Sequence, residues 1–160
     1  MSIVAVVGDC TTTIALALAA GWPSEHDAVV LEADRTGGSL AAWLGTPASP
    51  SLSTIVANSA AFGNSPSTVW AFVDTMVRDA PSGTRFIAAP VRSRAASRAL
   101  SEAGSTLFPL LAQLTEPTII ADIGSYAVCR LYSSDAADDL LFVVPGVRRI
   151  LNNRISDTTS

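Results

Sequence analysis

The sequence predicts a three-layer α/β/α domain built on a mostly parallel sheet of about five strands. Five short, mostly apolar runs, the first of them rich in β-branched residues, alternate with segments in which apolar residues recur at helical spacing. Such alternation is typical of βαβ units, which form parallel sheets with helices on both faces. Polar residues gather directly after three of the apolar runs, and the carboxyl ends of parallel strands meet at one edge of a sheet. We therefore expect the functional groups of this chain to share that edge.

The predicted strands are short and mostly apolar, as expected for strands covered on both faces. They comprise residues 3–7, 28–31, 85–89, 118–123 and 140–144. The predicted helices comprise residues 12–20, 39–44, 52–58, 67–78 and, in part, 126–137, with one or two more helices within residues 91–114. Glycine and proline end or interrupt helices, and serine caps them. We therefore expect Ser39 to cap the second helix, and the segment 91–114 to be interrupted near Gly104 and Pro109.

The composition excludes several classes of protein. A chain of 160 residues suits one domain, and its charged residues make up 15%, against about 25% in an average soluble domain. The net charge of −4 and the lack of a basic stripe argue against nonspecific nucleic-acid binding. Cys10 and Cys129 lie far apart and do not form a disulfide framework, so we expect a cytoplasmic protein. The apolar runs are too short for a membrane span or a signal peptide.

Residues 8–13 form a polar turn between the first strand and the first helix, which is the setting of a phosphate-binding loop. In such loops a lysine reaches the outer phosphates and neutralises the charge that develops there. This chain contains no lysine, because all ten of its basic residues are arginines. The sequence therefore argues against ordinary lysine-dependent nucleotide hydrolysis.

Several segments together resemble the ParA/MinD group of P-loop ATPases, in particular its degenerate actinobacterial members, over about residues 1–145. Residues 12–19 match the stretch that follows the family's loop, and residues 32–37 resemble its D-x-D-P-x-G switch segment. Residues 118–124 resemble its Walker B strand, and residues 137–145 resemble its next strand. No single motif is specific, but the order and spacing of the motifs agree with the family.

This resemblance implies a P-loop NTPase-like fold with the strands in the order 3-2-4-1-5. It also implies a functional site for which three sets of residues are candidates. The nucleotide would contact Gly8, Cys10, Thr11, Thr12 and Thr13; Mg²⁺ would bind Thr12, Asp34 and Asp122; and Glu32 and Asp34 would position water.

The chain departs from the family where nucleotide would bind. Its loop is several residues shorter, Thr11 stands in place of the phosphate-binding lysine, and Cys10 replaces a glycine. Asp9 adds a negative charge that opposes anion binding. In the switch-like segment Glu32 replaces an aspartate and Arg35 replaces a proline. These departures predict a noncatalytic scaffold or positioning protein that needs no cofactor and acts through protein–protein binding. The alternative is a weak or atypical ATPase that binds ATP and Mg²⁺.

The candidate residues also have simpler interpretations. Thr11 to Thr13 could only cap the first helix, and Asp34 and Asp122 could cap helices instead of binding metal. Cys10, at a helix N-terminus, could be a redox-sensitive thiol or an unreactive one. His26 is the only histidine and lies in a polar turn, so we expect it to be a surface residue.

Two further features bear on partners. Low charge and three tryptophans suggest a covered apolar surface, so we expect a homodimer or another protein partner with Trp43 at the contact. Residues 146–160 form a tail in which Val147, Ile150, Leu151 and Ile155 give a short amphipathic segment flanked by arginines. This segment permits weak membrane association, although packing against the sheet is the favoured interpretation.

The carboxylates at the sheet edge lead to a last expectation. If the fourth strand lies beside the first, Asp34 and Asp122 approach each other with little positive charge nearby. We expect one of three arrangements: Arg35 pairs with an aspartate, the aspartates cap helix amides, or a cation is bound.

Overall fold

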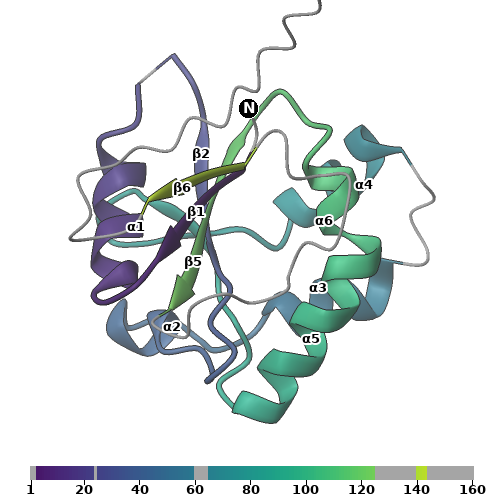
Figure 1. The fold of residues 1–160 in the computed structure, drawn as a ribbon, viewed down its shortest axis with the longest axis horizontal. Helices are drawn as coiled ribbons and strands as arrows, with labels where there is room; N and C mark the ends of the chain where they lie inside the picture. Colours follow the sequence, from purple (N-terminus) through teal and green to yellow (C-terminus); the bar gives the residue numbers. More distant parts are fainter. Residues whose placement is uncertain (1–2, 24, 60–64, 125–139, 144–160) are drawn as a thin grey trace, which may run out of the picture.

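The computed structural model describes residues 3–23, 25–59, 65–124 and 140–143. In these residues a central sheet lies between two layers of helices (Figure 1). The strands are β1 (Ile3–Val7), β2 (Ala28–Glu32), β3 (Arg78–Asp79), β4 (Arg85–Ile87), β5 (Thr118–Gly124) and β6 (Leu140–Val143). The helices are α1 (Thr11–Ala20), α2 (Leu40–Trp43), α3 (Leu52–Ser59), α4 (Pro66–Asp74), α5 (Ser93–Thr106) and α6 (Phe108–Leu111). The predicted α/β fold with a mostly parallel sheet is confirmed.

The sheet order is β3-β4-β2-β5-β1-β6. The neighbours from β4 to β6 all pair in parallel, whereas the two-residue strand β3 pairs antiparallel with β4 at one edge. Numbered without β3, the parallel strands follow the order 3-2-4-1-5. When β3 is counted, the later strands take higher numbers. The sequence did not predict this edge strand, because β3 consists of two charged residues.

The two faces of the sheet carry separate apolar cores, because successive side chains of a strand point to opposite faces. Ile119, Ala121 and Ile123 of β5 belong to the core that α3, α4, α5 and α6 cover. Ile120 of the same strand and Val30 of β2 belong to the core that α1 and α2 cover. Polar residues two positions after Ile120 and Val30 therefore lie on the α1–α2 side.

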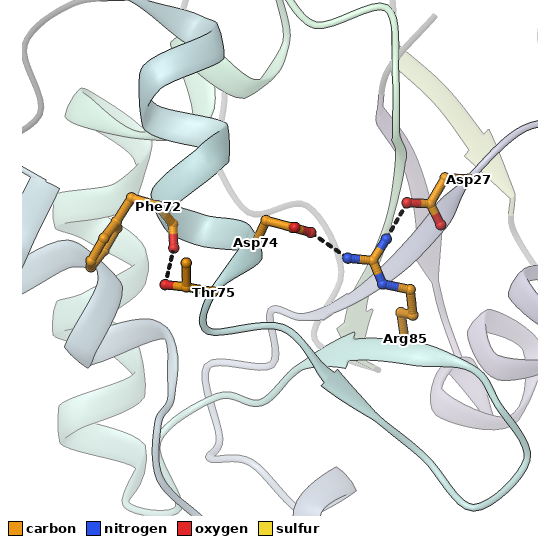
Figure 2. A network of polar contacts seen from close by, with 5 residues as sticks. All are labelled: Asp27, Phe72, Asp74, Thr75 and Arg85. Atoms are coloured by element: carbon orange, nitrogen blue, oxygen red, sulfur yellow. Dashed lines mark hydrogen bonds and ion pairs between the residues drawn. The ribbon is translucent and has the colours of Figure 1, made fainter.

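The predicted helix over residues 67–78 is too long. Helix α4 ends at Asp74 because Thr75 closes it: the amide and the hydroxyl of Thr75 both donate to the Phe72 carbonyl, at 3.1 and 2.7 Å (Figure 2). Arg78 then pairs with Phe86 in the sheet. The helix prediction failed here because β3 satisfies the backbone that a longer helix would have used.

The predicted interruption near Gly104 and Pro109 is found between these two residues, and Gly104 itself does not end a helix. Helix α5 runs through Gly104 to Thr106, and the break comes at Leu107, before α6. Pro109 lies in the first turn of α6, where its missing N–H removes no helical hydrogen bond. The predicted helix over residues 126–137, Cys129, the domain boundary after residue 145 and the tail over residues 146–160 lie outside the described residues.

Among the helices of the described residues, none is both long and apolar enough to cross a membrane.

Candidate functional site

The polar segments that follow β1, β2 and β5 meet at the carboxyl edge of the sheet, as the sequence predicted. Asp122 of β5 is in register with Val6 of β1 on one side and with Glu32 of β2 on the other. After β1 the Gly8 amide donates to the Gly124 carbonyl at 3.2 Å. The candidate residues from three distant parts of the sequence therefore form one site.

The loop between β1 and α1 is a tight turn of residues 8–10. Gly8 has φ of 123°, and Cys10, the residue before α1, has φ of 58°. Cys10 is the one non-glycine residue with positive φ among those the structure describes, and this left-handed conformation costs energy when the side chain has a Cβ. Cys10 and Asp9 are both exposed. This turn is shorter than a loop that wraps around a phosphate.

The Thr12 hydroxyl donates to Asp122 Oδ2 at 2.6 Å. Asp122 is 1% exposed, and its Oδ1 accepts the Gly124 amide at 3.3 Å. The capping interpretation is therefore wrong for Thr12: the residue before α1 is Cys10, it makes no side-chain cap, and the Thr12 hydroxyl contacts a carboxylate instead. Thr11 is buried and Thr13 is exposed.

Glu32 holds together two segments that follow neighbouring strands. Its Oε1 accepts the amides of Ser39 and Leu40 at 2.7 and 2.8 Å, and its Oε2 accepts the amide of Ala89 at 2.9 Å. The side chain is 1% exposed. The expected cap by Ser39 is wrong, because the Ser39 side chain makes no cap and the Glu32 carboxylate caps α2 in its place.

Burial raises the pKa of Glu32, because a buried carboxylate loses its hydration. The amides of Leu40, Ser39 and Ala89 act in the opposite direction by stabilising the charged form, and the nearby charge of Asp122 raises the pKa further. Burial outweighs the amides, so the ionised form of Glu32 is less favourable in the folded protein than in the unfolded chain.

Gly38 makes the Glu32 arrangement sterically feasible. A Cβ at Gly38 would lie 2.4 Å from the Ala89 carbonyl oxygen and 2.7 Å from Glu32 Oε2. The Gly38 amide donates to the Pro90 carbonyl at 2.8 Å, which fixes the same close approach. Sequence reasoning missed this role, although the adjacent glycines Gly37 and Gly38 were a signal that the backbone comes close to another segment.

Asp34 lies in a turn beside the Asp122 contact. Its Oδ1 accepts the amide and the hydroxyl of Thr36 at 2.8 and 2.7 Å. Its Oδ2 is so close to Gly124 that a Cβ there would approach it to 2.6 Å. Asp34 and Asp122 thus flank Gly124, and both accept backbone amides from turns. The amides that these two aspartates accept belong to Thr36 and Gly124, outside the helices, whereas Glu32 accepts the Leu40 amide of α2. The expected pairing of Arg35 and the expected cation stay predictions.

Trp43 and Val91 are the large apolar side chains that the described structure leaves most exposed, at 66% and 62%. Trp43 ends α2 and Val91 precedes α5, and Figure 1 shows α2 and the start of α5 at the end of the molecule toward which β5 points. The backbone before α2 lies close to the backbone before α5 at this end, because a Cβ at Gly37 would lie 2.3 Å from the Val91 carbonyl oxygen. Exposed apolar groups therefore lie at the same edge as the carboxylates.

His26 is exposed, and its Nδ1 lies 2.6 Å from Glu116 Oε1 at the opposite end of the strands. In the part of the chain that the structure describes, no group of three or more His, Cys, Asp and Glu side chains could hold a metal ion. The chain matches no protein-family model and no curated protein with which it was compared.

Proposed function

We propose that this protein is a noncatalytic scaffold or positioning protein of ParA/MinD type, in which a degenerate nucleotide site stabilises the fold and the protein acts by binding another protein. The observation that carries the proposal is the engagement of the buried carboxylates by the chain's own donors. Both oxygens of Glu32 accept backbone amides, and Asp122 accepts the Thr12 hydroxyl and the Gly124 amide. Groups that would bind Mg²⁺ or position water already have partners.

The loop gives independent support. A lysine contact to phosphate is worth about 1.5–3 kcal/mol, which is about ten- to a hundredfold in affinity. The chain has no lysine to make it, and the exposed Asp9 places a negative charge in the turn before α1. A nucleotide would therefore lack an attractive contact and meet a repulsive one.

The exposed Trp43 and Val91 support the protein-binding part of the proposal. Aromatic side chains are enriched at the centres of protein interfaces, and burial of a tryptophan against a partner removes a large apolar area from water. The partner would be a second copy of the chain or another protein, in the cytoplasm, without direct contact to nucleic acid; the basic tail over residues 146–160 permits at most weak membrane association.

A second candidate function is a weak or atypical ATPase. It is favoured by the Thr12–Asp122 hydrogen bond and by the approach of both Asp34 and Asp122 to Gly124, since a hydroxyl and two carboxylates supply oxygen ligands suited to Mg²⁺. In this alternative Mg²⁺ would replace the Thr12 proton as the partner of Asp122. Backbone amides at the start of α1 would then contact the phosphates.

The two candidates separate in a hydrolysis assay combined with light scattering. The proposal expects no turnover of ATP or GTP above the buffer rate, and a dimer or stable complex that weakens when Trp43→Ser removes the exposed indole. Ala42→Ser, at the exposed neighbouring position, is the matched control and should leave association unchanged. Turnover that is abolished by Asp34→Ala would replace the proposal with the ATPase, and a monomer at high concentration would exclude a second copy of the chain as the partner.

A further inference from the structure

The exposed Trp43 lies in a long part of the chain that carries no charge. No charged residue occurs between Arg35 and Asp74, and this range contains α2 and α3. Helix α3 packs against α5, and Figure 1 shows α2 and the start of α5 at the same end of the molecule. This part of the surface therefore takes its charge mainly from the segment that begins α5.

The segment that begins α5 is exposed and positively charged. Each residue from 91 to 95 is exposed, including Arg92 and Arg94. Neither arginine forms an ion pair with another residue that the structure describes. Arg98, further along α5, differs because Glu102 pairs with it and offsets its charge. Arg92 and Arg94 are therefore positive groups that a partner can reach.

Backbone contacts hold this segment beside the one that leads into α2. The Gly38 amide donates to the Pro90 carbonyl at 2.8 Å. The Ser97 hydroxyl donates to the Arg35 carbonyl at 3.2 Å. Trp43 lies only about one and a half helical turns after Gly38 along the chain. Exposed apolar and positive groups are therefore presented at the same end of the sheet on a fixed backbone.

The carboxylates of this edge do not cancel that positive charge. Glu32 and Asp122 are buried, and Asp34 is half-buried and accepts two hydrogen bonds within its own turn. Asp9 is exposed, but it follows β1, which β5 and β2 separate from β4. Three strand spacings amount to about 14 Å, which exceeds the screening length of about 8 Å at physiological ionic strength. Acidic and basic groups therefore occupy different parts of the edge.

This arrangement discriminates among three kinds of partner. A symmetric dimer through this surface would place the same patch of two copies face to face, and the juxtaposed arginines would repel each other. A nucleic acid would be repelled by the net charge of −4, and two arginines displace few counterions from it. A protein segment that combines carboxylates with an apolar side chain meets neither obstacle.

We propose that the basic apolar surface formed by Trp43, Val91, Arg92 and Arg94 binds an acidic segment of another protein. An apolar side chain of that segment packs on Trp43 and Val91, while its carboxylates pair with the two arginines. Guanidinium groups suit this role because they can bind carboxylates through two parallel hydrogen bonds. The proposal rests on the proposed protein-binding function and specifies the chemistry of the partner.

The test is an NMR titration of the full chain with the capped peptide Asp-Glu-Leu-Asp-Glu-Phe-Asp-Glu. We expect saturable shifts of the Trp43 indole and of the Arg92 and Arg94 amides. The Trp22 indole, after the end of α1, should not shift. A peptide with Asn and Gln in place of the acidic residues, and one with Ser in place of Leu and Phe, should both bind more weakly. An oligothymidine of the same charge should give no saturable shift.

Variants separate the charge from the apolar contact. Arg92→Gln and Arg94→Gln should each weaken binding of the acidic peptide by about 1.5- to fivefold, as expected for an exposed ion pair. Ser82→Glu is the control: it changes the net charge by the same amount, but it lies in the turn before β4, and it should leave the affinity unchanged. Trp43→Ser should weaken binding by about fivefold or more. All these positions are exposed, and a thermal melt checks that each variant is folded.

The proposal is overturned if the acidic peptide gives no saturable shift, if the neutral peptide binds equally well, or if both arginine variants keep the full affinity. Oligothymidine shifts at the same amides would replace the protein segment with a nucleic acid. Light scattering tests a second copy as the occupant, since a dimer that dissociates in Trp43→Ser and persists in Arg92→Gln would also overturn the proposal. If only Trp43→Ser weakens peptide binding, the proposed protein-binding function stands and the acidic partner is excluded; the proposed function fails separately, through ATP turnover.

Discussion

Glu32 and Asp122 are neighbouring buried carboxylates on adjacent strands, but they are stabilised in different ways. Glu32 accepts three backbone amides from segments that follow β2 and β4. Asp122 accepts a side-chain hydroxyl from α1 and one amide from its own turn. A carboxylate at the end of a strand is therefore not by its position alone a catalytic group. Glu32 holds together the backbone segments that follow β2 and β4. The main partner of Asp122 is instead a side chain, that of Thr12, which can rotate away.

The largest effect is expected from Glu32→Ala. Removing the carboxylate leaves the amides of Ser39, Leu40 and Ala89 without their acceptor, and a buried unsatisfied polar group costs about 1–3 kcal/mol. We expect the free energy of unfolding to fall by about 3 kcal/mol or more, measured by urea denaturation. The matched control is Glu25→Ala, an exposed carboxylate, which should change stability by less than about 0.5 kcal/mol. A small effect of Glu32→Ala would show that Glu32 is not the structural carboxylate.

The next largest effect tests the close approach that Glu32 requires. Gly38→Ala would place a methyl group against the Ala89 carbonyl and Glu32 Oε2, and overpacking of this kind costs about 1–3 kcal/mol. Gly104→Ala is the control in the opposite direction, because this helical position has open space around it. It should stabilise the protein by about 0.5–1 kcal/mol. Equal effects of the two substitutions in urea denaturation would contradict the packing described around Gly38.

Thr12→Val should have a smaller effect than Glu32→Ala. The substitution keeps the shape of the side chain and removes the hydroxyl that donates to Asp122, and a hydrogen bond to a charged group is worth about 1.5–3 kcal/mol. Thr13→Val, at the exposed neighbouring position, is the control. If Thr12→Val destabilises the fold more than Glu32→Ala does, the contrast between the two carboxylates is wrong.

The smallest effect is a pH dependence from Glu32. Because its pKa is raised in the folded protein, its contribution to stability is fully present below its unfolded pKa and is lost as pH rises through the folded value. Glu32→Gln removes this titration. We therefore expect the free energy of unfolding of the wild-type chain to fall, relative to that of Glu32→Gln, as pH rises from its ordinary pKa through the raised one. Urea denaturation across that range measures the difference, and parallel curves would contradict the raised pKa.

The sequence predicted the parallel strands well because they are short and mostly apolar, and the grouping of Gly8, Glu32 and Asp122 followed from parallel strands ending at one edge. It did not predict what Glu32 does, because its amide partners lie 7, 8 and 57 positions away and only the folded chain brings them to it. The same limit explains Gly104, where tertiary packing of α3 and α6 on α5 outweighs the weak helix propensity of glycine. Local sequence patterns therefore predicted the helices and strands, whereas contacts between residues far apart in the sequence determine what Glu32 does and why the helix continues through Gly104.

The central claim, that the carboxylates at this edge serve the fold instead of a nucleotide, is tested most directly by titrating the full chain with ATP in the presence and absence of Mg²⁺. Amide signals of Gly8, Thr12 and Gly124 would report binding at the turn before α1. We predict that these signals stay unchanged at millimolar ATP with or without Mg²⁺. Saturable shifts of these amides that require Mg²⁺ and disappear in Thr12→Val would contradict the claim and identify a working nucleotide site.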